Sequence, residues 1–411
     1  MKIFFISNWF PPVTSGSSFY VSSLAQALHA RGHEIHVITL DWGPEFHPSE
    51  TEGLTTHLLP VIRLPKLPIF YNLKLMGLAF TPSNIKRLQT LVRENNPDIL
   101  HHVNHVFDMN FLSVLVSKIE KIPLVGSITT PVQHQNPWIH GLYTLADRMT
   151  IGFFGTCRWD GIVSLDNTAH QYVKRVYGER TQRKSKMIPF GVPLEIIDLY
   201  TGTPVERSGR PQILFVGHIH PFRDPTLLVR AMPLILKRVP NARLVLAGRV
   251  GLSNPVKEAK RLGLSGDQVV FLGETPHEET VRLLKSSHAF ASWATGPFLG
   301  LGTAPMEAML CQTPVVNDFP ENLFGEGKLK NGENIILVNS KDPASIAENI
   351  IRLLDDEPFR QKVGAGGRKF VMENLNWERI AEAMEQFYKQ ILKQKGRTAA
   401  SLQAAAVSIE G

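Results

Sequence analysis

The sequence of 411 residues contains little cysteine. Its two cysteines, Cys157 and Cys311, lie far apart and predict no disulfide framework, which is typical of a protein from a reducing cytosol. No apolar run reaches the length needed to cross a bilayer. The first twelve residues, MKIFFISNWFPP, have one lysine and no small-residue cleavage site, so they predict a buried strand and not a signal peptide. We therefore expect a cytoplasmic protein.

Clustered metal ligands are also missing from the sequence. His101, His102 and His105 are near neighbours, but adjacent residues of a strand point to opposite faces, and no cysteine or carboxylate cluster completes a shell. We therefore expect no metal site. A net charge of +7 indicates an anionic partner, such as nucleotide phosphates, an acidic membrane surface or nucleic acid. No RNA- or DNA-binding module is recognisable, so nucleic acid is not expected.

Buried strands alternate with helices along most of the chain. Residues 2–7, 20–31 and 34–40 predict a strand, a helix and a strand, which is a βαβ unit. The alternation starts afresh after a polar link at 201–211. Asp224 and Pro225 then supply the cap and first turn of a helix predicted over 226–238. Further strands are predicted at 122–128, 161–165, 187–188, 213–216, 243–247, 269–272, 289–292 and 335–338. The chain therefore predicts two doubly wound α/β domains in tandem.

A glycine-rich loop precedes a short helix in the stretch ATGPFLGLGTAPMEAMLCQTPVVND, residues 294–318. Glycines let a backbone approach a ligand closely, and a helix start offers unpaired N–H groups to an anion. Glu307 on that helix could accept hydrogen bonds from the hydroxyls of a ribose. The alternative is an ordinary loop before a packed helix, with Glu307 solvated.

Residues 60–93 hold six basic residues and no acid, interleaved with aromatic and aliphatic ones. This mixture suits peripheral attachment to an anionic membrane surface. The alternative is an ordinary loop followed by a solvated basic helix over 83–93 that packs on the domain.

Two local motifs make narrower predictions. The strand at 122–128 is followed by a predicted polar loop that contains His134 and Trp138. Thr275, Pro276 and Glu278 have the spacing of a capping box at the start of a helix.

Taken in order, these motifs resemble those of the GT-B-fold glycosyltransferases of family 4 over residues 1–392. The segments that carry the resemblance are FFISNWFPPVTSG, LAQALHARGHEIHVIT, PDILHH, IPFGVP, ILFVGHIHPFRDP, ARLVLAGRVG, VVFLGETPHEE, GLGTAPMEAMLCQTPVV, NGENIILV and NLNWERIAEAM. The resemblance implies two Rossmann-like domains facing across a cleft. Residues 1–192 would bind the acceptor and residues 193–376 the nucleotide sugar. Residues 377–393 would form a helix that crosses back to the N-terminal domain, and we expect residues 394–411 to be a disordered tail.

The resemblance also implies a set of donor-binding residues, which are Gly16, His218, Arg223, Gly300, Leu301, Gly302, Thr303 and Glu307. Helix N-termini and basic side chains would neutralise the diphosphate, so no metal or other cofactor is expected. Arg223 replaces the family's usual lysine and keeps a permanent charge, whereas His218 replaces its arginine and is only partly charged at neutral pH. Glu307 resembles the ribose-binding glutamate.

Two positions depart from the family pattern. Leu299 stands where a second glutamate contacts the donor sugar, and Thr129 stands where many members carry a histidine near the reaction centre. Leucine accepts no hydrogen bond, and threonine is no comparable proton-handling group. We expect His134 and Trp138 to contribute to acceptor binding.

Two hypotheses follow from these matches and departures. The first is a retaining glycosyltransferase that moves a sugar from a UDP- or GDP-linked donor to a lipid-linked, polysaccharide or small-molecule acceptor, as in cell-envelope or polysaccharide biosynthesis. The second is a catalytically degenerate member that acts as a nucleotide-sugar- or glycan-binding subunit, or as a scaffold.

Overall fold

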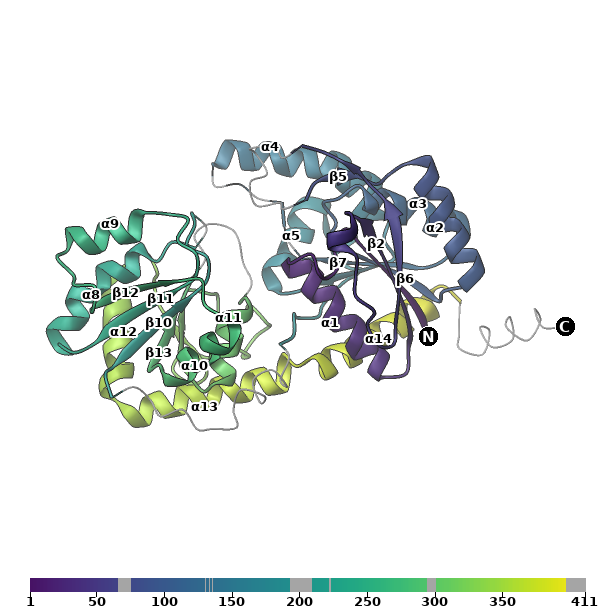
Figure 1. Cartoon of the computed structure of the whole chain (residues 1–411). Helices are drawn as coiled ribbons and strands as arrows, with labels where there is room; N and C mark the ends of the chain where they lie inside the picture. Colours follow the sequence, from purple (N-terminus) through teal and green to yellow (C-terminus); the bar gives the residue numbers. More distant parts are fainter. Residues whose placement is uncertain are drawn as a thin grey trace. The chain divides into compact units, whose positions relative to one another are not determined.

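Two parallel sheets form the centres of two units in the computed structural model of the chain (Figure 1). The structure describes residues 1–65, 75–129, 131–132, 134, 136–192, 209–221, 223–293 and 301–396. Unit 1 comprises Met1–Phe190 and Trp377–Gly411, and unit 2 comprises Gly191–Asn376.

The sheet of unit 1 has the strand order β3-β2-β1-β6-β7-β8-β9, and each neighbouring pair is parallel. Its central strand KIFFIS is buried because helices cover both faces, which explains its continuous apolar run. The strands are β1 (Lys2–Ser7), β2 (Glu34–Asp41), β3 (Leu54–Pro60), β6 (Ile99–Val103), β7 (Leu124–Ile128), β8 (Gly161–Ser164) and β9 (Ser185–Met187). A separate antiparallel hairpin pairs β4 (Ile62–Arg63) with β5 (Gly77–Leu78).

The helices of unit 1 divide between the two faces of its sheet. Ile3 and Phe5 of β1 pack in one hydrophobic cluster with α1 and α14, and Phe4 and Ile6 pack in another with α2 and α3. The helical segments are η1 (Pro44–Phe46), α1 (Gly16–Ala30), α2 (Pro82–Asn95), α3 (Met109–Glu120), α4 (Pro137–Asp147), η3 (Arg148–Gly155), η4 (Thr156–Arg158), α5 (Asn167–Tyr177), α6 (Glu179–Gln182) and α14 (Trp377–Gln394).

A buried chain of hydrogen bonds fastens α14 to this sheet. The imidazole of His101 on β6 contacts the hydroxyl of Tyr388 on α14 through Nδ1, and the hydroxyl of Ser127 on β7 through Nε2 at 2.7 Å. Ser127 also bonds the hydroxyl of Tyr20 on α1 at 2.9 Å. Burial lowers the pKa of His101 to about 3, so the ring is neutral. Both of its ring nitrogens form hydrogen bonds, and these bonds hold α14 against the sheet.

The sheet of unit 2 has the order β12-β11-β10-β13-β14-β15, again with parallel neighbours. Its strands are β10 (Gln212–Val216), β11 (Arg243–Ala247), β12 (Val269–Gly273), β13 (Ala289–Ala291), β14 (Val315–Asn317) and β15 (Ile336–Leu337). Its helices are α8 (Thr226–Arg238), α9 (Asn254–Arg261), α10 (His277–Ser286), α11 (Thr303–Leu310), α12 (Pro343–Asp355) and α13 (Glu357–Asn374).

The expected pair of doubly wound parallel sheets is confirmed, with two local corrections. The predicted polar loop around Trp138 is wrong from residue 137 onward, because Asn136 caps the helix α4 by accepting the N–H of Trp138 at 3.0 Å. The predicted capping box is also wrong, because the hydroxyl of Thr275 contacts that of Thr280 at 3.0 Å and caps no N–H group of α10. Asp224 does accept the N–H of Thr226 at 2.9 Å, at the start of α8.

No helix among the described residues is both long enough and apolar enough to pass through a membrane.

We predict that Tyr388→Phe destabilises unit 1. The change removes a hydroxyl that contacts Nδ1 of the buried His101 and leaves a polar atom without a partner, which costs about 1 to 3 kcal/mol. For a unit of this size the midpoint of thermal unfolding should fall by roughly 2 to 4 °C per kcal/mol. Tyr143→Phe, on the part-exposed helix α4, is the control. Equal midpoints for Tyr388→Phe and the unaltered protein would contradict a supporting role of this hydrogen bond.

Candidate active site

The order of strands reverses once in each sheet, and both candidate sites lie at these reversals. In unit 1 the chain runs from β1 to β2 and β3 on one side, and from β6 onward on the other. In unit 2 the same reversal separates β10 from β13. Connections that leave two adjacent parallel strands in opposite directions open a crevice at their carboxyl ends, where α/β proteins bind ligands.

The loops after β10 and β11 approach each other unusually closely. A Cβ atom added to Gly248 would lie 2.1 Å from the carbonyl oxygen of Gly217, so no side chain fits there. Both glycines have positive φ angles, +150° at Gly217 and +138° at Gly248. Backbone hydrogen bonds join the loops, from Gly217 to Ala247 and from Ile219 to Arg249, each 2.9 Å long. The candidate site in unit 2 therefore has a tightly tied backbone.

Arg223, which we expect from the sequence to bind the donor, lies beside the beginning of α11. A Cβ added to Gly217 would lie 3.3 Å from Nη1 of Arg223, and one added to Gly302 would lie 3.7 Å from its Nη2. Gly302 has φ +75° and precedes Thr303, the first residue of α11. Within the described part of the chain, no carboxylate pairs with the guanidinium of Arg223. An exposed cation and a helix N-terminus thus share one small crevice.

That crevice has a volume of about 50 Å³ and is lined by residues that follow β10, β13 and β14. Leu301 is buried, and Trp293 and Phe319 supply further apolar surface. His218 directly follows Gly217 and is exposed, with its backbone nitrogen beside Gly248. Two predicted positions, Leu299 and Gly300, fall outside the residues that the structure describes. The structure therefore brings Arg223, Leu301, Gly302 and Thr303 together.

Glu307 has a partner that was not recognised from the sequence. Its Oε1 lies 3.3 Å from Nε2 of His277, the first residue of α10. The hydrogen bond to Glu307 raises the pKa of His277, against an opposing effect of burial. The contact joins the first residue of α10 to the middle of α11. His277 is four residues beyond the end of β12, and ligand-binding side chains are common at such positions. This position is the one feature of the sequence that could have indicated His277 as a site residue.

In unit 1 a mostly apolar cavity of about 250 Å³ occupies the reversal between β1 and β6. It brings together Gly16, the first residue of α1, and Thr129, directly after β7. The Thr129 hydroxyl is buried and has no hydrogen-bond partner among the described residues. The lining residues that were not recognised from the sequence include Trp9, Asn104, Phe107, Leu165 and Phe190. Their positions in the sequence could have indicated them, since most follow the carboxyl end of a strand.

His134 and Trp138, the residues expected at the acceptor, do not line this cavity. The Nδ1 atom of His134 accepts the N–H of Asn136 at 3.0 Å, and its ring meets that of Tyr143 edge to face. Trp138 is exposed on α4. The two side chains therefore lie outside the apolar cavity that holds Gly16 and Thr129.

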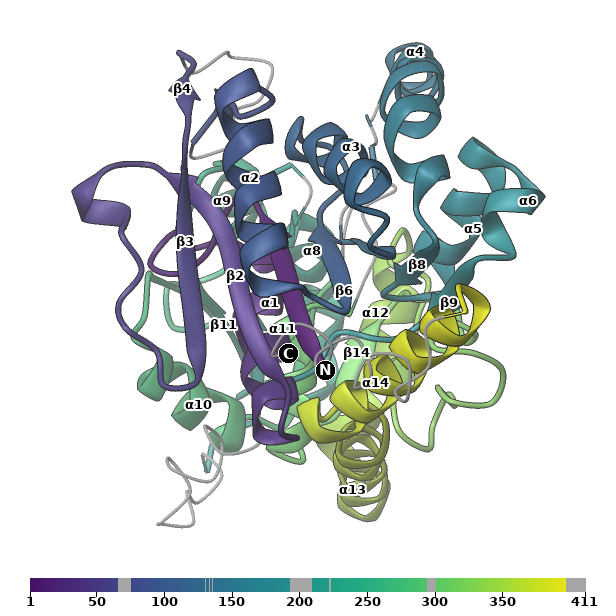
Figure 2. The same ribbon diagram turned by 90° about the vertical axis from the view of Figure 1, so that its right-hand side faces the viewer.

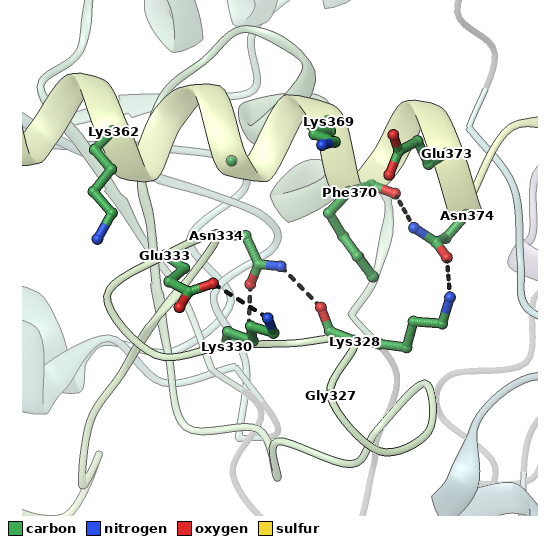
Figure 3. Close-up of a pocket in the computed structure, with 11 residues that line it drawn as sticks. Gly327, Lys328, Lys330, Glu333, Asn334, Lys362, Lys369, Phe370, Glu373 and Asn374 are labelled. Atoms are coloured by element: carbon green, nitrogen blue, oxygen red, sulfur yellow. Dashed lines mark hydrogen bonds and ion pairs between the residues drawn. The ribbon is translucent and has the colours of Figure 1, made fainter.

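A larger cavity, about 520 Å³, lies in unit 2 between α13 and the loop before β15 (Figure 3). Four lysines line it, Lys328, Lys330, Lys362 and Lys369. Because its loop leads into β15, this cavity is at the amino ends of the strands. Some of its polar groups also pair with one another, as Lys330 does with Glu333 at 3.5 Å. Unlike the other two sites, it therefore does not lie at the carboxyl ends of the strands.

Two family models match the chain, one to each half. Residues 14–196 match the family described as Glycosyltransferase Family 4, and residues 202–370 match that described as Glycosyl transferases group 1. An uncharacterized glycosyltransferase of Methanocaldococcus jannaschii is 26% identical, with 97% of this chain and 100% of the relative covered. A glycogen synthase of Mycobacterium tuberculosis is 22% identical, with 94% of each chain covered.

Solved structures show the same fold at low sequence identity. Sucrose-phosphate synthase from Thermosynechococcus elongatus has a TM-score of 0.70 and 20% identity, with 96% of this chain and 99% of that chain covered. HepE of Anabaena, solved in complex with UDP, has a TM-score of 0.69 and 15% identity, with 94% and 99% covered.

We predict that Glu307→Gln lowers the pKa of His277. The carboxylate stabilises the imidazolium, so the pair contributes to stability below the ordinary histidine pKa and the contribution is lost as pH rises through the raised pKa. An NMR titration of the His277 ring would show the change. Glu278→Gln, which removes a neighbouring carboxylate paired with Arg282, is the control. A His277 titration that is the same in all three proteins would contradict the ion pair.

Proposed function

Because this chain belongs to the GT-B-fold glycosyltransferases of family 4, we propose that it transfers a sugar from a UDP- or GDP-linked donor to an acceptor hydroxyl with retention of configuration. The protein is a transferase enzyme, and the proposal concerns its donor, acceptor and stereochemistry. The observation that carries it is the position of Arg223 between Gly217 and Gly302, beside the N-terminus of α11.

The unit 2 crevice supplies the interactions that a nucleotide diphosphate needs. Arg223 and the unpaired N–H groups of α11 would neutralise the phosphates, and Gly302 leaves room for their approach. Glu307, held by His277, would accept hydrogen bonds from the ribose. The complex of the Anabaena neighbour with UDP is consistent with this nucleotide class. We propose that the diphosphate is neutralised in this way without a metal ion.

The proposed chemistry needs no enzymic base. The bond between the anomeric carbon and the phosphate oxygen breaks, and its electron pair stays on that oxygen. The acceptor oxygen bonds to the anomeric carbon on the face that the phosphate vacates, and its proton passes to the departing phosphate oxygen. Configuration is thereby retained, and the Thr129 hydroxyl, which lines the unit 1 cavity, has no proton to transfer in this scheme.

For the acceptor we propose a glycan or a lipid-linked molecule bound in unit 1. The cavity that contains Gly16 and Thr129 is lined mainly by apolar and aromatic side chains, among them Trp9, Phe107 and Phe190. Aromatic surfaces favour the apolar face of a sugar ring or a lipid segment. The glycogen synthase relative, whose name indicates a glycan, is consistent with the first of these classes.

A panel of UDP- and GDP-sugars tests the proposal directly. Each is assayed for thermal stabilisation, for slow hydrolysis and for transfer, with and without EDTA. One or more donors should raise the melting temperature, because a ligand that binds only the folded state stabilises it. Transfer should persist in EDTA, and NMR of the product should show the donor's anomeric configuration. Tight nucleotide binding without turnover of any donor would contradict the proposal, as would an inverted product.

We predict that Arg223→Gln lowers kcat/KM by about 100-fold or more, since it removes a cation from the position of the leaving diphosphate. Arg223→Lys should retain part of the activity because it keeps the charge but loses the bidentate geometry. Arg238→Gln, at the C-terminal end of helix α8 and paired with Asp355, is the matched control. Steady-state kinetics with the best donor would measure all three. Equal losses for the Arg223 and Arg238 variants to Gln would argue against a phosphate contact.

We predict that Gly16→Ala impairs catalysis without destabilising the fold. No protein atom of the described chain lies within 4 Å of an added Cβ at Gly16, so folding does not require glycine, and alanine should leave the melting temperature unchanged or slightly raised. A substrate group that approaches the start of α1 in the unit 1 cavity would meet the methyl group, and kcat/KM should fall about tenfold or more. Gly141→Ala, also without a close neighbour, is the control. Unchanged kinetics for Gly16→Ala would remove this residue from the substrate-binding site.

A further inference from the structure

The helix α4 and its continuation η3 expose an apolar face. Trp138 is 89% exposed, and five further large apolar side chains are each more than half exposed: Leu142, Leu145, Met149, Phe153 and Phe154. These six residues, the apolar stripe, follow one another at intervals of three or four, apart from the last pair, so they share one side of the helix. The last two follow Met149 by four and five positions. Since a π-helical turn such as η3 holds more residues than an α-helical one, both lie near its direction.

The opposite, polar side of this helix is the one that packs on unit 1. Asp147 is buried and accepts hydrogen bonds from the hydroxyls of Tyr172 and Tyr177 on α5, at 2.9 and 3.0 Å for Tyr177. Burial raises the pKa of this carboxyl group. Glycines allow close contact further along, because a Cβ added to Gly152 would lie 2.7 Å from the ring of Tyr177, and one added to Gly155 would lie 2.4 Å from the amide nitrogen of Asn110.

The polarity of this helix is therefore the reverse of that expected for a surface helix, whose apolar side normally packs inward. Its polar side is anchored by specific hydrogen bonds and its apolar side is left in water. Six large apolar side chains on one face exceed the scattered exposure that is ordinary for protein surfaces. Such a face is expected to bind an apolar surface or a membrane interface, because either would remove its side chains from water.

A second exposed apolar group lies at the same end of unit 1. Figure 1 shows β5, and Figure 2 shows its partner β4, at the upper end of unit 1, where both views also place α4. Around this hairpin, Ile62, Leu64, Leu78 and Phe80 are exposed. Asp108 holds the hairpin by accepting the N–H groups of Ala79 and Phe80 at 2.6 and 2.7 Å.

The two sequence segments that carry these groups contain more basic than acidic residues. Residues 136–158 contain a single acid, the buried Asp147, whereas Arg148 and Arg158 are exposed. Residues 60–93 contain no acid, and Arg63, Lys86 and Arg87 among them are exposed. Aromatic and aliphatic side chains edged by arginine and lysine are typical of segments that lie in the interface of an anionic bilayer.

We propose that the apolar stripe, together with the β4–β5 hairpin, docks unit 1 on a membrane that contains anionic phospholipid. The stripe enters the interface between headgroups and acyl chains, and the flanking basic residues contact lipid phosphates. This surface includes only part of the 60–93 segment expected from the sequence, since residues 66–74 lie outside the described chain. The proposal rests on unit 1 alone and does not depend on the donor or acceptor proposed above.

Vesicle sedimentation without any nucleotide tests the docking. Phosphatidylcholine vesicles that contain phosphatidylglycerol should retain the protein at low salt, and pure phosphatidylcholine vesicles should retain less. A triple variant, Leu142→Ser, Met149→Ser and Phe153→Ser, should lower the partition coefficient by about tenfold or more. The control triple, Leu234→Ser, Leu272→Ser and Met372→Ser, removes three apolar side chains of unit 2 that are each 43 to 45% exposed, and this variant should bind normally.

Tryptophan fluorescence reports insertion of the stripe itself. Of the six tryptophans, five are at most 9% exposed and only Trp138 is accessible to acrylamide. Anionic vesicles should therefore shift the emission to shorter wavelength and suppress quenching, and Trp138→Phe should abolish both signals while sedimentation with vesicles persists. Equal binding by the two triple variants, or quenching unaltered by vesicles, would overturn the proposal. Light scattering that shows a dimer of the unaltered protein and a monomer of the stripe variant would instead assign this face to a second copy of the chain.

Discussion

The reversal of strand order within each parallel sheet is the constraint on which both candidate sites depend. Connections that diverge from β1 and β6, and from β10 and β13, leave no backbone between them at the carboxyl edge. Residues that are remote in sequence therefore meet there. Gly16 and Thr129 share the cavity of unit 1, while Arg223 and Gly302 share the crevice of unit 2. Two copies of one topological feature supply a polar, positively charged crevice in one unit and a mainly apolar cavity in the other.

The positive character of the unit 2 crevice arises from few groups. The guanidinium of Arg223 remains charged at any physiological pH, and the N-terminus of α11 adds a fixed partial charge. Close packing of Gly217 on Gly248 keeps the surrounding backbone in place. Glu307 is the negative group nearby, and His277 holds it. Preorganised charge of this kind binds an anion without the reorganisation that flexible side chains would need.

Unit 1 shows that polarity within a helix does not by itself tell which face is buried. The buried carboxyl group of Asp147 and two close glycine contacts fasten α4 and η3 by their polar side. Apolar side chains on the other side stay in water, at the same end of the unit as the exposed β4–β5 hairpin. Hydrogen bonds to a buried carboxylate thus hold this helix on unit 1, in place of the apolar packing that usually holds a surface helix.

The sequence alone determined the parallel sheets and many of their elements. Apolar runs and helical periodicity are local properties, so the strand Arg243–Ala247 and the helix Thr226–Arg238 were placed with correct bounds. The resemblance also indicated Arg223 and Glu307. Only the tertiary structure decided what those residues touch. The pair of Glu307 and His277 spans 30 residues, and the anchoring of α4 depends on hydroxyls that α5 brings to Asp147. Such contacts are set by how elements pack, and no local periodicity encodes them.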